Sequence, residues 1–483
     1  MSKLYVFAIG GTGSRVLRSL TMLLAAGVKP GVDTIVPIII DPDTANADLT
    51  RAVSLMNDYT TLNKTQRYSS GSQNRFFKTK ISKQQKDYTL PFDNIGGVSF
   101  ETFLGVDAME REDQALVRML FSQKNLDSLM DVGFKGNPNI GSVVLNQIFD
   151  SDEFNSIANS FSQGDEIFIV SSIFGGTGAS GFPMLLKTLR TSDHFSNNDL
   201  INKARIGAVT ILPYFKVDGS STDDSKEIKS GTFISKAKSA LSYYRANIAV
   251  GNAAVDDLYF LGDDLNDHVY KYSEGGSTQR NDAHLMEFLA ATAIIDFTNN
   301  NNNKRGADDP IETTNYELGI KDLEGDSVHF SSFYDGLDKM LYYPLTQFTL
   351  MTNTFKEDYS YLKNTLAATK SMDDFYSSPF IKSLKSFMSR YDEWLKEMDG
   401  NVRALQLFNF NCGKLPFNLI NGPEGPKDHW YNILGKKNYE LVEATLNGKS
   451  GDAKKIEKDS NPSMFLEMFY RATKELIDKK LKH

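Results

Sequence analysis

Hydrophobic and polar positions alternate in blocks through the first half of the chain. Short, almost continuously apolar runs predict buried strands, and these runs are Leu4–Ile9, Ile35–Ile40, Glu166–Ser171, Ile206–Leu212 and Asp257–Leu261. Longer segments with helical periodicity lie between them, and these are Ser14–Ala26, Val143–Phe161, Phe182–Leu189 and Asp224–Asn247. Buried strands that alternate with helices predict an α/β fold, in which a parallel sheet is covered by helices on both faces.

The segment Asn281–Phe297 differs from the other predicted helices because apolar residues lie on all of its sides. Such a helix is buried against several neighbours. Asn281 or Asp282 is suited to cap its N-terminus. We interpret His284, one turn after Asn281, as a satisfied buried histidine, with a contact to a ligand as the alternative.

The second half of the chain has a different pattern of hydrophobic and polar residues. A polar run follows the apolar helix and predicts a linker, and the residues beyond Ser327 are mostly helical. The expected helices there are Phe355–Lys370, Asp373–Met398 and Ser463–Leu481. The segment Thr50–Asp131 has a mixed pattern, and we expect an elaboration on the edge of the sheet.

Composition excludes several classes of protein. A length of 483 residues predicts two or three domains, and 40% hydrophobic with 24% charged residues is typical of a soluble globular protein. No apolar run approaches the roughly 20 residues that span a bilayer, and the N-terminus lacks a signal-peptide pattern. The single cysteine, Cys412, fits a reducing cytoplasm. We therefore expect a cytoplasmic protein without direct membrane insertion.

Charge and metal-ligand patterns narrow the partners further. The net charge of -8 argues against binding to nucleic acid. Six scattered histidines and one cysteine form no spacing typical of a metal site, so no protein-bound metal cluster is expected.

Two glycine-rich stretches each follow a predicted strand and precede a predicted helix. The first contains Gly10, Gly11, Thr12, Gly13 and Ser14, and the second contains Gly175, Gly176, Thr177, Gly178 and Ala179. Backbone amides and hydroxyls at two neighbouring helix N-termini would cradle a polyphosphate from two sides. A Rossmann dinucleotide loop, with Asp41 on a ribose, is an alternative, but Val16 stands where that motif has its third glycine. The remaining alternative is a pair of tight strand-to-helix turns without a ligand.

The stretch "SSIFGGTGASGFP" resembles the signature loop of the tubulin and FtsZ superfamily. Other segments resemble that family in the same order. "AIGGTGSRV" is similar to its first phosphate loop, and "GFKGNPNIG", which contains Gly136 and Asn137, is similar to the loop that reaches the terminal phosphate. "IGAVTILPYFKVDG" resembles the strand and sugar-contacting loop, with Asp218 at the ribose position. "DDLYFLGDD" resembles the next strand, and "NDAHLMEF" resembles the start of the central helix, where Asn281 would contact the base.

The resemblance covers Leu4 to about Phe297 and implies a domain order. Residues 1–280 would form a tubulin/FtsZ-like nucleotide-binding domain and 281–298 the central helix. Residues 299–326 would form a polar linker with a possible acidic catalytic loop, and 327–483 a mostly helical C-terminal domain. The implied ligands are GTP or GDP with Mg²⁺.

Two positions depart from the family pattern at the base. Arg15 stands where the family has Asn or Gln, and Ser277 stands where it has an aromatic residue that stacks on guanine. Arg15 and Asn281 are the candidate contacts to the base. Asp41 and Asp43 would bind Mg²⁺ through water or contact a ribose, and their alternative role is to cap a helix.

The resemblance also implies that hydrolysis needs a second subunit. In the family, acidic residues after the central helix position water at the neighbour's terminal phosphate. Asn315 and Glu317 are the candidates here, with Asp322, Glu324 and Asp326 as competitors and an ordinary acidic surface loop or short strand as the alternative. The expected partner is the protein itself in a head-to-tail homopolymer. A non-polymerising nucleotide switch or scaffold, which acts through partner proteins on the C-terminal helices, is the second hypothesis, and a Rossmann oxidoreductase is the third.

Overall fold

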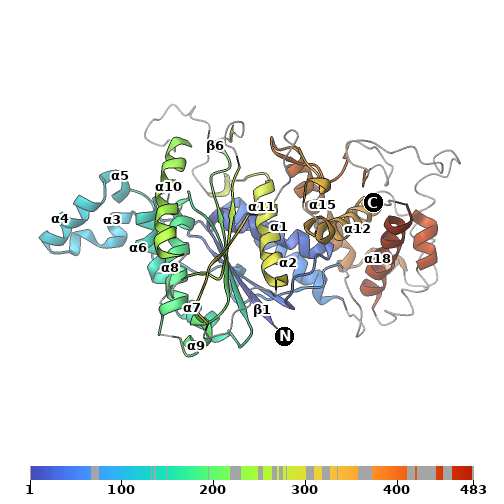
Figure 1. Ribbon diagram of the computed structural model, residues 1–483, viewed down its shortest axis with the longest axis horizontal. Helices are drawn as coiled ribbons and strands as arrows, with labels where there is room; N and C mark the ends of the chain where they lie inside the picture. The colour runs from blue at the N-terminus through green and yellow to red at the C-terminus, as the bar shows by residue number, and fades with distance from the viewer. Residues whose placement is uncertain are drawn as a thin grey trace.

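The protein is built around one parallel β-sheet (Figure 1). The computed structural model describes residues 2–66, 76–131, 133–134, 137–149, 151–193, 195–217, 230–248, 254–263, 269–270, 276–278, 280–300, 309–317, 327–333, 336–356, 372–410, 419–420, 442–449 and 460–480. The sheet has seven strands in the order β3-β2-β1-β4-β5-β7-β9. In chain order the strands are β1 (Lys3–Ile9), β2 (Thr34–Ile40), β3 (Lys80–Ile81), β4 (Glu166–Ser172), β5 (Ile206–Ile211), β7 (Asp257–Leu261) and β9 (Thr314–Glu317). Every pairing among them is parallel, which confirms the predicted α/β class.

Helices cover both faces of the sheet, so the central strands are buried on both sides and read as apolar runs. In Figure 1, α6 (Pro138–Phe149), α7 (Asp152–Asn159), α8 (Gly176–Thr191), α9 (Asn198–Asn202) and α10 (Ser230–Asn247) lie on one face. On the other face lie α1 (Gly10–Ala26), α2 (Ala47–Lys64) and α11 (Leu285–Asn299). The strand predictions agree with the structure to within one residue at each end.

Several helix boundaries differ from the predictions. Helices α1 and α8 begin inside the glycine runs, at Gly10 and Gly176, several residues before the expected starts. The expected helix Val143–Phe161 is two helices, because the Ser151 hydroxyl accepts a hydrogen bond from the Phe154 amide and caps a new helix, α7. The start of the expected helix Asp224–Asn247 lies outside the described residues.

Helix α11 is the expected buried central helix. Only Asp296 and Asn299 of this helix are not fully buried. Its N-cap is His284, and the prediction of Asn281 or Asp282 as the cap was wrong. The His284 Nδ1 accepts a hydrogen bond from the Met286 amide, and the His284 amide donates to the Glu287 carboxylate, which together form a capping box.

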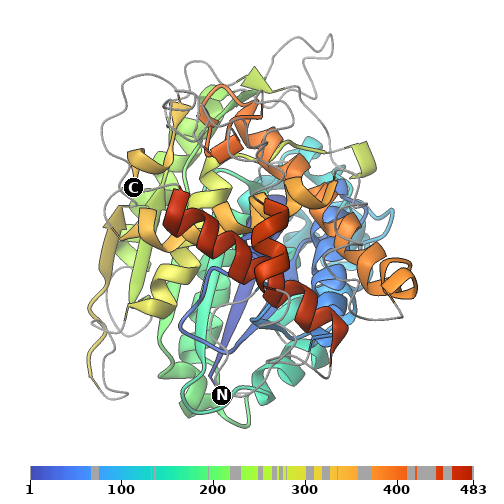
Figure 2. The ribbon, with the colours of Figure 1, turned by 90° about the vertical axis from the view of Figure 1, so that its right-hand side faces the viewer.

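The C-terminal region is helical, as predicted, and it packs on the α1/α2 side of the sheet (Figure 2). It contains α12 (Leu337–Lys356), α14 (Met372–Tyr376), α15 (Pro379–Asp399), a helix at 442–449 and α18 (Asn461–Lys480). The expected helix Asp373–Met398 is interrupted, because Ser378 caps α15 and Pro379 occupies its first position. Most of the expected helix Phe355–Lys370 lies outside the described residues.

Residues 50–131 form the expected elaboration. They supply most of α2, the edge strand β3 and an arm of short helices, α3 (Phe100–Leu104), α4 (Arg111–Leu120) and α5 (Gln123–Leu126), which projects away from the sheet beside α6 (Figure 1). In the part of the chain that the structure describes, no helix combines the length and apolar composition needed to cross a bilayer.

Candidate functional site

The two glycine-rich loops meet at one edge of the sheet. Strands β1 and β4 are parallel neighbours, so both loops leave the sheet at its carboxyl edge. Gly10 has a φ of 72°, a left-handed conformation that favours glycine. A Cβ atom on Gly10 would lie 3.5 Å from the Thr177 Cβ and 3.9 Å from the Gly178 nitrogen. The structure therefore brings the two predicted phosphate loops into contact.

Neither helix at these loops is capped by a side chain. The N-cap residues are Ile9 for α1 and Gly175 for α8, and neither side chain has an oxygen atom that could accept from the helix amides. No acidic residue occupies the first turn of either helix. Two positive helix ends therefore point to the same place without an internal counter-charge, which is the condition for binding an anion.

The glycines in these loops have separable roles. A Cβ atom on Gly13 would lie 2.5 Å from the Ala8 carbonyl carbon, and one on Gly178 would lie 2.6 Å from the Ser172 carbonyl oxygen. These two glycines are required for helix and strand to pack closely. Gly11 has only the Asn46 Nδ2 nearby, at 3.8 Å, and it is the one residue of α1 that is not fully buried. Gly11 is therefore the position of α1 where a ligand has access to the helix end.

The segment before α6 forms a further wall of the site. A Cβ atom on Gly141 would lie 2.3 Å from the Ser180 Oγ and 3.0 Å from the Gly176 oxygen, so the first turns of α6 and α8 are in close contact. Asn137, directly before α6, is half-buried, and its carbonyl accepts from the Gly141 amide. Gly136 lies outside the described residues.

Two buried carboxylates follow β2, next to the first glycine loop. The Asp41 Oδ1 accepts from the Asp43 amide at 3.1 Å, and the Asp43 Oδ2 accepts from the Gly276 amide at 2.7 Å. Burial, and then the charge of Asp43, raise the pKa of Asp41 to about 7. The Asp43 Oδ1 is buried and has no hydrogen-bond partner among the described residues, and the same is true of the Ser14 Oγ in α1. These orphaned oxygens fit a site that holds a cation or a polar ligand.

The alternative role of Asp41 and Asp43 as helix caps is wrong. Helix α2 is capped by Asn46, whose Oδ1 accepts from the amides of Asp48 and Leu49. No group of three His, Cys, Asp or Glu side chains is arranged to hold a metal ion within the described ranges. A cation at Asp41 and Asp43 would therefore take most of its ligands from water and phosphate, as Mg²⁺ commonly does.

Arg15 lies at the centre of a buried ion-pair cluster that links α1, α2 and α11. Its Nε donates to the Glu287 Oε1 at 2.5 Å, and its Nη1 lies 3.4 Å from the Asp48 Oδ2. Its Nη2 donates to the Tyr214 hydroxyl at 2.9 Å and lies 3.5 Å from the Thr12 Oγ1. Burial raises the pKa of Glu287, and the charge and hydrogen bond of Arg15 oppose this shift. Arg15 therefore joins the first glycine loop to the central helix.

Asn281 lies at the rim of the same cluster. Its backbone amide and its Nδ2 donate to the two Asp48 carboxylate oxygens at 3.0 and 2.7 Å, and its carbonyl accepts from the Arg51 Nη1 at 2.9 Å. This arrangement holds the segment before α11 against α2. The sequence pattern did not mark Asp48, Glu287 or Tyr214 as members of this cluster. Glu287 carried a signal, because it is the only ionisable side chain in the first two turns of an otherwise apolar helix.

Asn315 and Glu317 do not join this site within one chain. They lie on β9, and β4, β5 and β7 separate that strand from β1. Asn315 is exposed. Asp218, Asp322, Glu324 and Asp326 lie outside the described residues.

No protein-family model matches the chain, and no curated protein is similar to it in sequence. Solved structures to which it is similar include CetZ and FtsZ proteins. CetZ from Methanosaeta thermophila is 14% identical, with a TM-score of 0.27 and coverage of 54% of this chain and 46% of that chain. An empty FtsZ dimer from M. jannaschii is 18% identical, with a TM-score of 0.26 and coverage of 54% and 45%. A GTPγS-bound protofilament of CetZ2 from Haloferax volcanii is 16% identical, with a TM-score of 0.26 and coverage of 54% and 49%. The match spans about half the length of each of these chains.

Proposed function

We propose that this protein binds a guanine nucleotide, GTP or GDP with Mg²⁺, at the junction of the two glycine loops. The observation that carries the proposal is the contact between two helix N-termini that have neither a capping side chain nor an acidic first turn. The amides of Gly10–Gly13 and Gly175–Gly178, with the hydroxyls of Thr12, Ser14 and Thr177, would hold the phosphates. The Ala179 amide donates to the Gly175 carbonyl, so Ala179 would only line the site.

The remaining candidates surround these loops. Asn137 and Gly136 would approach the terminal phosphate from the start of α6. Asp41 and Asp43 would hold Mg²⁺ through water or contact the ribose, and Asp218 would contact the ribose. Asn281 would contact the base. Most N–H groups of Arg15 already donate to Glu287, Asp48 and Tyr214, so only a remaining N–H could contact the base. We therefore assign Arg15 mainly to holding the first glycine loop against α11.

We further propose that hydrolysis is completed by a second copy of the chain. The sheet order separates β9 from the glycine loops of its own chain, so Asn315 and Glu317 could act on phosphate only from a neighbour. A contact in which one copy supplies the phosphate loops and the next supplies the acid is heterologous if it joins different faces of the two copies, and such a contact repeats into a filament. The proposed activity is therefore a GTPase that works at a head-to-tail joint.

A non-polymerising switch is the second candidate, and a specific contact favours it. The Glu397 Oε2, in the C-terminal helix α15, accepts from the Ala283 amide at 2.9 Å, two residues from Asn281. A base bound at Asn281 would therefore shift the position of α15, and a partner protein bound to the C-terminal helices would detect that shift.

Three measurements test the proposal and separate the filament from the switch. Chromatography of the denatured, freshly purified protein should release GDP or GTP, and recovery of a nicotinamide cofactor would refute the assignment. Specific GTPase activity should rise with protein concentration, because each site needs two chains. Glu317→Ala should slow hydrolysis and leave nucleotide binding unchanged. Binding with a concentration-independent specific activity would reject the filament and favour the switch.

A further inference from the structure

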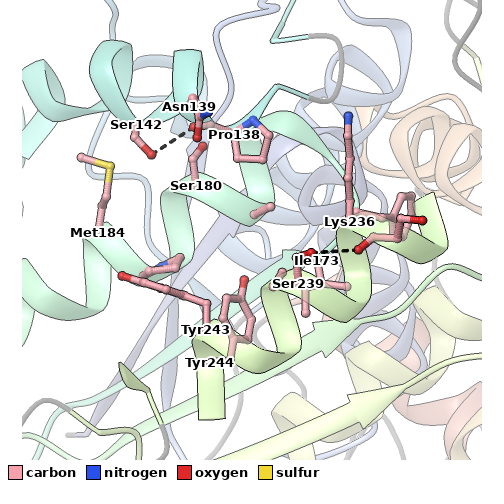
Figure 3. A pocket seen from close by; sticks show the side chains of 15 residues that line it. Pro138, Asn139, Ser142, Ile173, Ser180, Met184, Lys236, Ser239, Tyr243 and Tyr244 are labelled. Carbon is pink, nitrogen blue, oxygen red and sulfur yellow. Dashed lines mark hydrogen bonds between the residues drawn. The ribbon is translucent and has the colours of Figure 1, made fainter. Parts of the chain in front are cut away.

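A groove lies between α6, α8 and α10, next to the second glycine loop. It encloses a cavity of about 510 Å³ (Figure 3). Its apolar lining residues include Ile173, Phe174, Pro183 and Met184. Its rim carries Lys236 and Tyr243 of α10. A concave apolar floor with a polar rim is typical of a surface that receives side chains of a partner.

Helix α4 of the projecting arm has the complementary shape. None of its residues is buried. One side of the helix packs against the rest of the arm through Val117. Phe121, which follows the helix, also packs there, and its ring lies 5.0 Å from that of Phe100. The other side presents Leu116, Met119 and Leu120, whose exposed fractions are 49%, 79% and 62%. The spacing of these three residues places them on one face of the helix, as in a helix that inserts into a groove.

The charges of the arm and of the groove are opposite. Residues 100–120 of the arm contain five carboxylates and two arginines. Helix α10 contains three cations, Lys236, Lys238 and Arg245, and no carboxylate. Opposite charges of this kind orient two surfaces as they approach and hold the register of the contact.

The arm cannot fold back into the groove of its own chain. Its base is fixed at both ends, because the Phe100 amide donates to the Ser128 carbonyl and the Met130 amide donates to the Val98 carbonyl. Phe100, Leu126 and Met130 are buried. From this base the arm projects outward on the same side of the molecule as α10 (Figure 1).

We propose that two copies of this chain associate sideways, with α4 of each copy inserted in the α6/α8/α10 groove of the other. Since the arm and the groove lie on the same side of one molecule, the two contacts form together around a two-fold axis. Two reciprocal contacts double the buried surface, which brings it toward the size of stable interfaces. This association does not use β9. The groove borders the second glycine loop through Ala179 and the start of α6 through Pro138 and Asn139, so the sideways dimer competes with the proposed filament joint for this edge of the molecule.

Sedimentation equilibrium of the full chain across the micromolar range tests the proposal, with and without GTP. The wild-type protein should form a dimer in both conditions, and the dimer should weaken as salt increases. Met119→Glu places a charge on the inserted face and should weaken the dimer by at least about tenfold. Val402→Glu is the matched control, since Val402 is 49% exposed on a turn after α15, outside both the arm and the groove.

A mixing experiment distinguishes this pairing from other modes of association. Ser239→Glu places a charge on the exposed groove wall, and this variant should also be monomeric. A mixture of Met119→Glu with Ser239→Glu retains one contact between an intact arm and an intact groove, so it should associate more strongly than either variant alone. A wild-type monomer at all concentrations, or a dimer that survives Met119→Glu, would overturn the proposal. A mixture that associates no more strongly than either variant alone would also overturn it.

Discussion

Replacement of Gly11 by aspartate should separate the ligand site from the fold. Gly11 is the one residue of α1 with solvent access, and its backbone has no left-handed φ. A Cβ atom at this position would meet only the Asn46 Nδ2, at an ordinary contact distance of 3.8 Å. The helix therefore accepts a side chain here, and a carboxylate would stand at the N-terminal end of α1, where we place the phosphates.

The size of the effect follows from Coulomb's law. At a separation of about 5 Å and an effective dielectric constant of about 20, two like unit charges repel by about 3 kcal/mol. A loss of this size weakens binding by about two orders of magnitude. A polyphosphate carries more than one charge, so this is the lower end of the range. The new carboxylate also complements the helix dipole, which should add about 0.3–1 kcal/mol to the stability of the empty protein.

Isothermal titration calorimetry with GDP and GTP measures the loss, and urea unfolding measures the stability. Gly11→Ala is the matched control, because it adds the Cβ atom without the charge and should bind nearly as well as the wild type. If Gly11→Asp binds nucleotide as tightly as Gly11→Ala does, the phosphates do not lie at this helix end and the site assignment is wrong.

Three further variants test single features of the structure. The pKa of Asp41 is raised to about 7, whereas its value in the unfolded chain is about 4, so the folded protein keeps this proton between these two pH values. The free energy of unfolding of the nucleotide-free protein should therefore fall by about 1.4 kcal/mol per pH unit as the pH rises from about 4 to about 7. Asp41→Asn should remove this slope in urea titrations. Gly13→Ala should lower the free energy of unfolding by about 1–3 kcal/mol, since the new Cβ atom would overlap the Ala8 carbonyl carbon. An unchanged free energy of unfolding would show that α1 and β1 can move apart to accept the Cβ atom. Glu397→Gln should lower stability by about 1–3 kcal/mol at neutral pH, since it weakens the hydrogen bonds to Arg18 and the Ala283 amide; no change in the urea midpoint would show that these contacts contribute nothing.

The sequence predicted those parts of the fold that depend on local pattern. Strands buried on both faces give short, continuous apolar runs, and the glycines and polar residues that bound these runs mark where each strand begins and ends, so five strands were located to within a residue. The glycine loops were found for a related reason. Where α1 packs against β1 at Gly13, and α8 against β4 at Gly178, there is no space for a Cβ atom. Only glycine fits these positions, so the sequence itself shows the requirement.

The parts that could not be predicted depend on contacts between distant residues. The cap of α11 was assigned to Asn281 or Asp282, but Asp48 holds the Asn281 side chain and His284 takes the position. Arg15 was interpreted as a base contact because it replaces an amide residue of the family pattern. Its partners Glu287 and Asp48 lie 272 and 33 residues away, and no periodicity or spacing connects them.

The segment Asn281–His284 gives the site its connection to the rest of the molecule. On one side Asp48 binds Asn281, and on the other side the carbonyl of Ala283 accepts from the Asn401 Nδ2 at 2.6 Å while its amide donates to Glu397. Glu397 also accepts from the Arg18 Nη1 at 2.6 Å. These groups are largely buried, so a shift of the segment would leave charged atoms unpaired unless α15 moved with it. If a nucleotide binds as we propose and displaces Asn281, it must do work against the C-terminal helices, and a partner that binds those helices would then alter nucleotide affinity by the same free energy.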